Sequence, residues 1–191
     1  AKGTAAQALV MNAGATAPEW ADAAGGAWAV RGSATNFSGV ASVIIGSLTK
    51  TTRIILTNII PSNDNVYVKF TVSNDSGSSY SATGYYFSVR GWNSAGNVQE
   101  NYGENTSSFN GGSNHGNATN ENGFFVTTIY EPQIASSWTH WHTDSHAVNS
   151  SGTLSHRDGG GFHKVASATT GIKFVPTAGT FSGTYLILEL N

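Results

Sequence analysis

The chain contains no cysteine among its 191 residues, which excludes disulfide bonds, thiolate metal sites and a cysteine nucleophile. Charged residues are also scarce, at 10% of the chain, compared with about 25% in ordinary globular proteins. The formal net charge is -2, whereas nucleic-acid binding requires clusters of lysine and arginine. We therefore expect no nucleic-acid partner and a surface built largely from Asn, Ser, Thr and Gly.

Long apolar runs are missing as well. No stretch is long enough to cross a bilayer, and no charged segment followed by an apolar one marks a signal peptide. We expect a soluble protein without membrane insertion. The sequence begins at Ala1 rather than at Met, so we also expect it to be a piece of a longer chain.

What the sequence does contain is an alternation of apolar and polar residues with a period of two. Val66, Val68 and Phe70 fall on one face of a strand, while Tyr67 and Lys69 fall on the other. Helical periodicity is almost absent, and turn residues recur at short intervals. This pattern predicts an all-β fold, an antiparallel β-sandwich of jelly-roll-like type. The predicted strands span residues 27–31, 40–45, 53–58, 66–72, 85–92, 124–130, 137–143, 171–175 and 184–190.

Two polar segments interrupt this pattern. Residues 93–123 form a Gly/Asn/Ser-rich tract, and a loop of that length is unusual inside one domain. Either this tract contains short strands, or it forms a surface loop that has a function. Residues 144–162, with three glycines at 159–161, are predicted to be a second polar excursion.

Residues 1–26 are predicted to be an extended segment that precedes a sandwich domain over residues 27–191. Leu9, Val10, Met11 and Trp20 make this leader too apolar for a solvated linker. The leader is also too short to bury enough surface by itself. It must therefore pack against the following domain or be completed by copies of itself. We expect these four residues to form an oligomer interface.

The six histidines include a His-x-His pair, His140 and His142, whose rings project from one face of a predicted strand. Such a pair can supply two metal ligands, as in cupin sandwiches, but no Glu follows at the cupin position. In a threefold assembly, three such pairs would suit an octahedral divalent ion. The alternative is that both are ordinary polar strand residues. We expect no cofactor. The one bound ion that the histidine pattern allows is a structural divalent metal.

Enzymatic chemistry finds little support in the sequence. No pair of carboxylates stands out as a glycosidase pair, and there is no G-x-S-x-G motif. We expect no catalytic residues. A weakly charged β scaffold with aromatic residues in long polar loops instead suits recognition of polyhydroxylated ligands, because aromatic rings stack on sugars and amides bond hydroxyls. The candidate ligand-binding residues are Trp92, Asn93, Tyr102, Phe109, Asn114, His115, Trp138 and His140.

The leader resembles a motif of bacteriophage tail fibres, where it precedes a C-terminal globular domain. The similar segments are GTAAQALV at residues 3–10 and AGATAPEWA at 13–21. Further patches resemble phage structural proteins of the same kind: LTNIIPSND at 56–64, SNDSGSSY at 73–80, GIKFV at 171–175 and GTFSGTYL at 179–186. Members of this group often end in a Tyr-Gly pair, whereas this chain ends in Leu188-Glu189-Leu190-Asn191.

This resemblance implies a homotrimeric β-sandwich tip at the end of a virion fibre, joined to the shaft through residues 1–26. Such a tip attaches the virion to a host cell-surface glycan or protein, and it resides in the host cytoplasm during assembly. The resemblance carries over no catalytic residues.

Three other functions remain open from the sequence. The first is a virion structural component without receptor contact, such as a baseplate, collar or capsid-decorating protein. The second is a cupin-type enzyme with a histidine-bound metal. The third is a carbohydrate-binding module of a secreted enzyme, which predicts a monomer.

Overall fold

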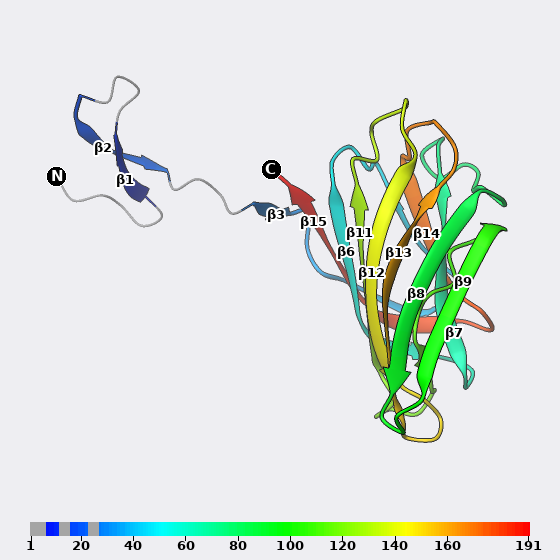
Figure 1. The fold of residues 1–191 in the computed structure, drawn as a ribbon. Helices are drawn as coiled ribbons and strands as arrows, with labels where there is room; N and C mark the ends of the chain where they lie inside the picture. The colour runs from blue at the N-terminus through cyan, green and yellow to red at the C-terminus, as the bar shows by residue number, and fades with distance from the viewer. Residues whose placement is uncertain (1–6, 12–15, 23–26) are drawn as a thin grey trace. The chain divides into compact units, whose positions relative to one another are not determined.

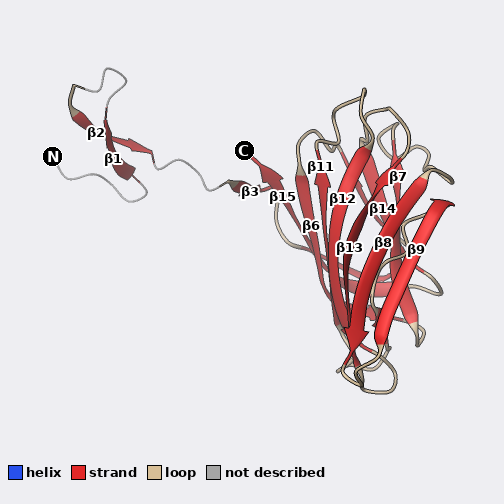
Figure 2. Ribbon diagram, viewed as in Figure 1, coloured by secondary structure: helices blue, strands red, loops and turns tan. Residues whose placement is uncertain are grey.

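The computed structural model describes residues 7–11, 16–22 and 27–191. Every regular element in these ranges is a β-strand, and every strand pairing is antiparallel (Figure 2). The prediction of an all-β antiparallel sandwich is therefore confirmed. Within the same ranges, no helix is long and apolar enough to cross a membrane.

The chain divides into two compact units. The first comprises Ala1–Ala29 and Asn191, and the second comprises Val30–Leu190. In the first unit, β1 (Gln7–Met11) and β2 (Pro18–Asp22) pair as an antiparallel two-stranded sheet. The short strand β3 (Trp28–Val30) spans the boundary between the units.

The predicted oligomer interface lies in the first unit. The backbone register places Leu9 opposite Trp20. The side chains of Leu9, Val10 and Trp20 lie outside the described residues. The side chain of Met11 is 55% exposed in the single chain. The interface between copies stays a prediction.

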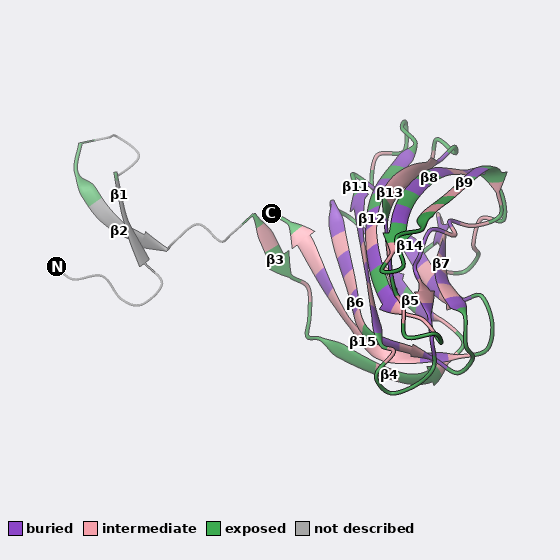
Figure 3. Ribbon diagram, turned by 60° about the horizontal axis from the view of Figure 1, so that its bottom comes forward, coloured by how far each residue is buried: buried purple, intermediate pink, exposed green. Residues whose placement is uncertain are grey.

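The second unit contains a larger and a smaller sheet. The larger sheet contains β4 (Thr35–Val40), β6 (Thr52–Pro61), β8 (Tyr85–Asn93), β9 (Val98–Thr106), β11 (Gly123–Tyr130), β12 (Thr139–Val148), β13 (Leu154–His163) and β15 (Phe181–Leu190). Its order is β15-β6-β11-β12-β13-β8-β9 (Figure 1), and β4 also pairs with β15 (Figure 3). The smaller sheet has the order β10-β7-β14-β5, formed by β10 (Asn114–His115), β7 (Val66–Ser73), β14 (Gly171–Pro176) and β5 (Val43–Gly46).

The core lies between these two sheets. The ring of Phe70 on β7 meets that of Trp141 on β12 at 5.3 Å between centroids. Phe125 on β11 meets Phe174 on β14 at 5.9 Å. Burying a side chain of this size stabilises the fold by roughly 1.5–3 kcal/mol. Along the strands, buried residues alternate with exposed ones, so the larger sheet keeps one face toward the core and one toward solvent (Figure 3).

The two segments predicted to be polar excursions are largely strands. Residues 93–123 contain β9 and β10, which confirms the alternative that this tract hides strands. Residues 144–162 complete β12 and form most of β13. The prediction of a surface excursion there is wrong, because β13 pairs with β12 on one side and with β8 on the other.

The three glycines of residues 159–161 explain this error. Glycine clusters usually mark turns, but here the neighbouring strands approach too closely for a side chain. A Cβ on Gly159 would lie 2.3 Å from the carbonyl oxygen of Ser88, and one on Gly161 would lie 2.3 Å from that of Tyr86. Glycine is required by this close approach rather than by a turn.

Candidate functional site

The solvent-facing side of the larger sheet carries its side chains in rows that cross the strands. The row at the centre crosses four neighbouring strands, and we call it the trough row. Strand register aligns its members, which are Thr128, His142, Gly160 and Ser88 on β11, β12, β13 and β8. Thr128 and Ser88 are small and Gly160 has no side chain, so the row is low at Thr128 and from Gly160 to Ser88, while the half-exposed side chain of His142 stands between these two stretches.

Two hollows lie along the trough row. The first, about 260 Å³, lies at the Thr128 end, where it is lined by Arg53, Asp144 and Asp158 among others. The second, about 340 Å³, lies at the Ser88 end and includes Gly160 on its floor. The floor is fixed by geometry, because a Cβ on Gly160 would lie 2.6 Å from the carbonyl oxygen of Trp141.

An aromatic wall borders the trough row on one side. Phe162 lies two residues beyond Gly160 on β13, so its ring projects from the same face. It stacks on Tyr86 with ring centroids 5.2 Å apart and on Trp138 at 5.0 Å. The Lys164 ammonium lies 5.3 Å and 5.5 Å from the centroids of the Tyr86 and Trp138 rings. The contacts hold three aromatic side chains as one surface, which we call the aromatic wall.

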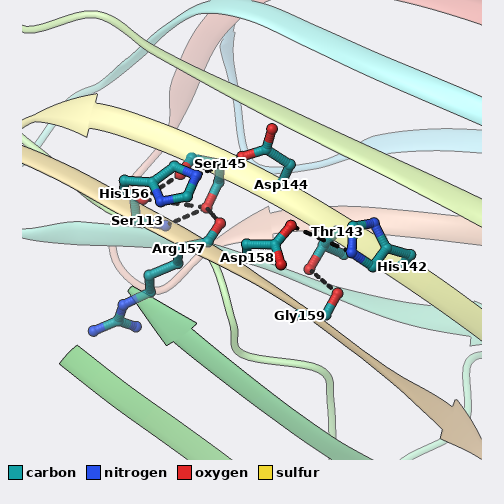
Figure 4. A network of polar contacts seen from close by, with 9 residues as sticks. All are labelled: Ser113, His142, Thr143, Asp144, Ser145, His156, Arg157, Asp158 and Gly159. Atoms are coloured by element: carbon teal, nitrogen blue, oxygen red, sulfur yellow. Dashed lines mark hydrogen bonds and ion pairs between the residues drawn. The ribbon is translucent and has the colours of Figure 1, made fainter. Parts of the chain in front are cut away.

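A charged wall borders the trough row on the other side. Asp144 on β12 lies directly opposite Asp158 on β13, although the sequence had offered no facing pair of carboxylates. Like charges in this position destabilise a sheet. A histidine lies next to each carboxylate: His142 Nε2 lies 3.3 Å from Asp158 Oδ2, and His156 Nε2 lies 3.1 Å from Asp144 Oδ1 (Figure 4).

The crossed pairing leaves one oxygen of each carboxylate available. Each of the two aspartates is bound by histidine through a single oxygen. Among the described residues, the other oxygen of each accepts no protein hydrogen bond. At the adjoining end of the trough, Arg53 Nε donates to Thr128 Oγ1 at 3.1 Å. The charged wall therefore presents hydrogen-bond acceptors held in fixed positions and a guanidinium group next to them.

Several predicted ligand residues lie on or next to this face. Trp92 on β8 is 59% exposed, Tyr102 on β9 is 78% exposed, and Trp138, in the aromatic wall, is 41% exposed. Tyr102 lies opposite Ser88 and extends the trough row by one strand. His140 lies opposite Phe162, and its ring centroid is 5.6 Å from the Phe162 ring.

The other predicted ligand residues need correction or lie elsewhere. Phe109 is fully buried, because it pairs with the backbone of Phe70 and packs 4.7 Å from its ring. His115 is also fully buried, and one ring nitrogen lies 2.9 Å from the carbonyl oxygen of Ser113. Neither side chain can reach a ligand at the surface. Asn114 lies on β10 in the smaller sheet, and Asn93 ends β8.

The burial of His115 also determines its charge. Removal from water disfavours the imidazolium, so the pKa of His115 falls from 6.5 to about 4. The nearby ring of His146 lowers it further, while the carbonyl oxygens of Ser113 and Val66 oppose the shift. His115 is therefore a neutral core residue at physiological pH.

The candidate metal ligands, His140 and His142, project from the same face as expected for neighbouring positions of one strand. In the part of the chain that the structure describes, no three His, Asp or Glu side chains gather closely enough to hold a metal ion. His142 is instead paired with Asp158. A metal shared between copies of the chain stays a prediction.

Sequence reasoning missed most of the two walls. The sequence predicts Tyr86 in the strand 85–92 and places Asp144, Asp158 and Phe162 in the polar segment 144–162, without assigning any of them to a site. A signal was present, because every second residue from His140 to His146 is His or Asp, and His156 and Asp158 repeat this spacing. The three glycines concealed it by suggesting a turn.

Comparison with known proteins adds no assignment: no protein-family model matches this chain, and no curated protein matches it.

Proposed function

We propose that this chain is a receptor-binding domain that holds a host-surface glycan along the trough row. The observation that carries this proposal is the pairing of an aromatic wall with a wall of carboxylates on either side of the trough row, which is bare backbone at Gly160. The C–H face of a sugar packs on aromatic rings, and its hydroxyls donate to carboxylates. Sites of this kind combine apolar lining with a few placed polar groups.

The dimensions support an oligosaccharide rather than a single sugar. Neighbouring strands lie about 4.8 Å apart, so the trough row from β11 to β8 spans about 14 Å. The two walls lie four residues apart on β13, which corresponds to about 13 Å. An extended glycan would cross the strands, with its apolar faces toward Phe162 and its hydroxyls toward Asp158.

The wider proposal is that the domain forms the homotrimeric tip of a bacteriophage tail fibre, carried on the virion. Its support is the resemblance of the leader and of the later patches to tail-fibre sequences. A trimer would combine three weak sites, so that avidity makes up for low affinity at each. Sedimentation equilibrium at micromolar concentration tests this arrangement, and a stable monomer would contradict it.

The glycan proposal is tested with an array of bacterial surface polysaccharides and oligosaccharides probed with the whole chain. We expect at least one neutral glycan to bind saturably. Asp158→Asn and Phe162→Ala should weaken that binding tenfold or more, because each loses interactions worth about 1.4 kcal/mol or more. Glu131→Gln, an exposed carboxylate change outside the trough, is the matched control. The proposal would be contradicted if no glycan bound, or if all variants bound the glycan equally well.

A competition experiment separates receptor binding from a purely structural role in the virion. The soluble chain should block phage adsorption to cells that display the bound glycan, and Asp158→Asn should fail to block it. A virion component without receptor contact would leave adsorption unchanged at any concentration of the chain.

A further inference from the structure

A second hollow with different chemistry lies on the smaller sheet. It has a volume of about 280 Å³. Its lining comes from β7, β14, the residues after β7 and the residues after β9, and it consists of hydroxyl-bearing, cationic and small apolar side chains. These residues are Lys69, Thr71, Tyr80, Ser81, Ala82, Ser107, Ser108, Lys173 and Val175.

Strand register brings the polar groups of this hollow into two adjacent rows. Thr71 on β7 lies directly opposite Lys173 on β14. The antiparallel bridge between Phe70 and Phe109 places Ser108 on the other side of Thr71. Lys69 lies diagonal to Lys173, a relationship in which long side chains reach one another. Two ammonium groups therefore border a strip of hydroxyls.

Neither lysine has an acidic partner. The lining contains no Asp or Glu, and among the described residues neither Lys69 nor Lys173 forms an ion pair. Lys173 Nζ instead lies 4.1 Å from the centroid of the Tyr80 ring. Two like charges on neighbouring strands are unfavourable without a counter-ion.

Asp75, whose charge acts on the Tyr80 hydroxyl, is already used by its own loop. It accepts hydrogen bonds from the backbone N–H of Ser79 at 2.8 Å, from the Ser79 hydroxyl at 2.6 Å and from the Ser73 hydroxyl at 2.7 Å. These hydrogen bonds, those from Ser79 first, lower the pKa of Asp75 from 3.8 to about 2. The carboxylate thus orders the loop that carries Tyr80 rather than neutralising the lysines.

Two hydroxyls of the hollow also lack partners. Thr71 Oγ1 and the Tyr80 hydroxyl are shielded from solvent, and no protein atom forms a hydrogen bond with either. An unsatisfied buried donor costs about 1–3 kcal/mol, and the Thr71 hydroxyl recovers that cost if its side chain rotates to donate to an acceptor brought by a ligand. The cations and the unpaired hydroxyls therefore favour the same kind of occupant.

We propose that this hollow binds an anionic group, a phosphate, sulfate or carboxylate, between Lys69 and Lys173, with hydroxyls such as that of Thr71 donating to it. Lysine acts as a point charge and does not require a planar bidentate partner, so the site accepts tetrahedral as well as planar anions. The site lies on the sheet opposite the trough and does not depend on glycan binding there.

The test uses the full chain titrated with inorganic phosphate and, separately, with sodium sulfate, followed by two-dimensional amide NMR. Saturable shifts at residues 69–71, 80–82, 107–108 and 173 are expected. The double variant Lys69→Gln/Lys173→Gln should weaken binding tenfold or more, and Thr71→Val should weaken it severalfold while keeping the shape of the side chain. Lys50→Gln, an exposed lysine outside the hollow, is the matched control. Far-UV circular dichroism of each variant verifies the fold.

A second arm identifies the source of the anion. A sugar phosphate that binds more tightly than inorganic phosphate indicates an anionic substituent on a glycan, whereas equal affinities indicate a free anion. Unsaturable shifts, or equal binding by the double variant and Lys50→Gln, would overturn the site. Asp158→Asn in the trough should leave phosphate binding unchanged, so failure here and failure of the glycan proposal are distinguishable.

Discussion

Asp144 and Asp158 lie directly opposite each other on neighbouring strands, and each is bound by a histidine located on the strand of the other. The result is a crossed arrangement in which two carboxylates that would repel one another are held in place. Both sit at the surface, where an ion pair contributes about 0–1 kcal/mol. The arrangement therefore positions acceptor oxygens more than it stabilises the fold.

This distinction gives a prediction for Asp158→Asn. The substitution removes the pairing with His142 and also the repulsion of Asp144, so the free energy of unfolding should change by less than about 1 kcal/mol. Glycan affinity should nevertheless fall tenfold or more. Urea denaturation and glycan titration measured on the same variant test the separation. A large loss of stability would show that the pair is structural.

Gly159→Ala should destabilise the chain by about 1–3 kcal/mol or more, because its Cβ would lie 2.3 Å from the carbonyl oxygen of Ser88. The backbone of β8 would have to move. Gly46→Ala is the matched control, since its Cβ meets no atom closer than 3.7 Å. Thermal unfolding of the two variants should differ clearly, and equal melting temperatures would contradict the close approach of β13 to β8.

His115 predicts a loss of stability in mild acid. Its pKa is lowered from 6.5 to about 4 in the fold, so the unfolded chain binds more protons between these values. Stability should fall as the pH drops from about 6.5 toward 4, by about 3 kcal/mol at most from this group. Urea denaturation across this range should show a shallower pH dependence for His115→Gln. An unchanged slope would mean that other groups dominate.

The raised pKa of Tyr85 predicts a loss of stability at alkaline pH. Burial is the main cause that raises its pKa from 10.0 to about 12, so the unfolded chain releases a proton first. Stability should be unaffected by this group below pH 10 and should fall between about pH 10 and 12. Tyr85→Phe should abolish this contribution.

The same substitution has a second effect at neutral pH. The Tyr85 hydroxyl accepts a hydrogen bond from the backbone N–H of Val72 at 2.8 Å and donates to the carbonyl oxygen of Ser81 at 3.2 Å. Tyr85→Phe leaves the buried N–H unpaired, which should cost about 1–3 kcal/mol. Chemical denaturation at pH 7 measures this cost.

The sequence predicts the fold class because strand periodicity survives in segments such as 66–72 and 184–190. It fails at β13, where Gly159, Gly160 and Gly161 have the composition of a turn but the environment of a crowded sheet. That failure also hid the charged wall, because Asp158 faces Asp144 only when residues 154–163 form a strand. Phe109 and His115 show the reverse error, since polar neighbours in the sequence suggested a surface that the sandwich instead encloses.

Gly160 limits how this domain can diversify. A side chain at that position would collide with the backbone of Trp141, so the trough row cannot vary at this position. Under the proposed function, a change of ligand would come most directly from the two walls, at Tyr86, Phe162, Asp144 or Asp158, or from Tyr102 at the end of the trough row. Libraries that randomise these five positions and leave the glycine intact are the natural starting point for redirecting the domain to another ligand.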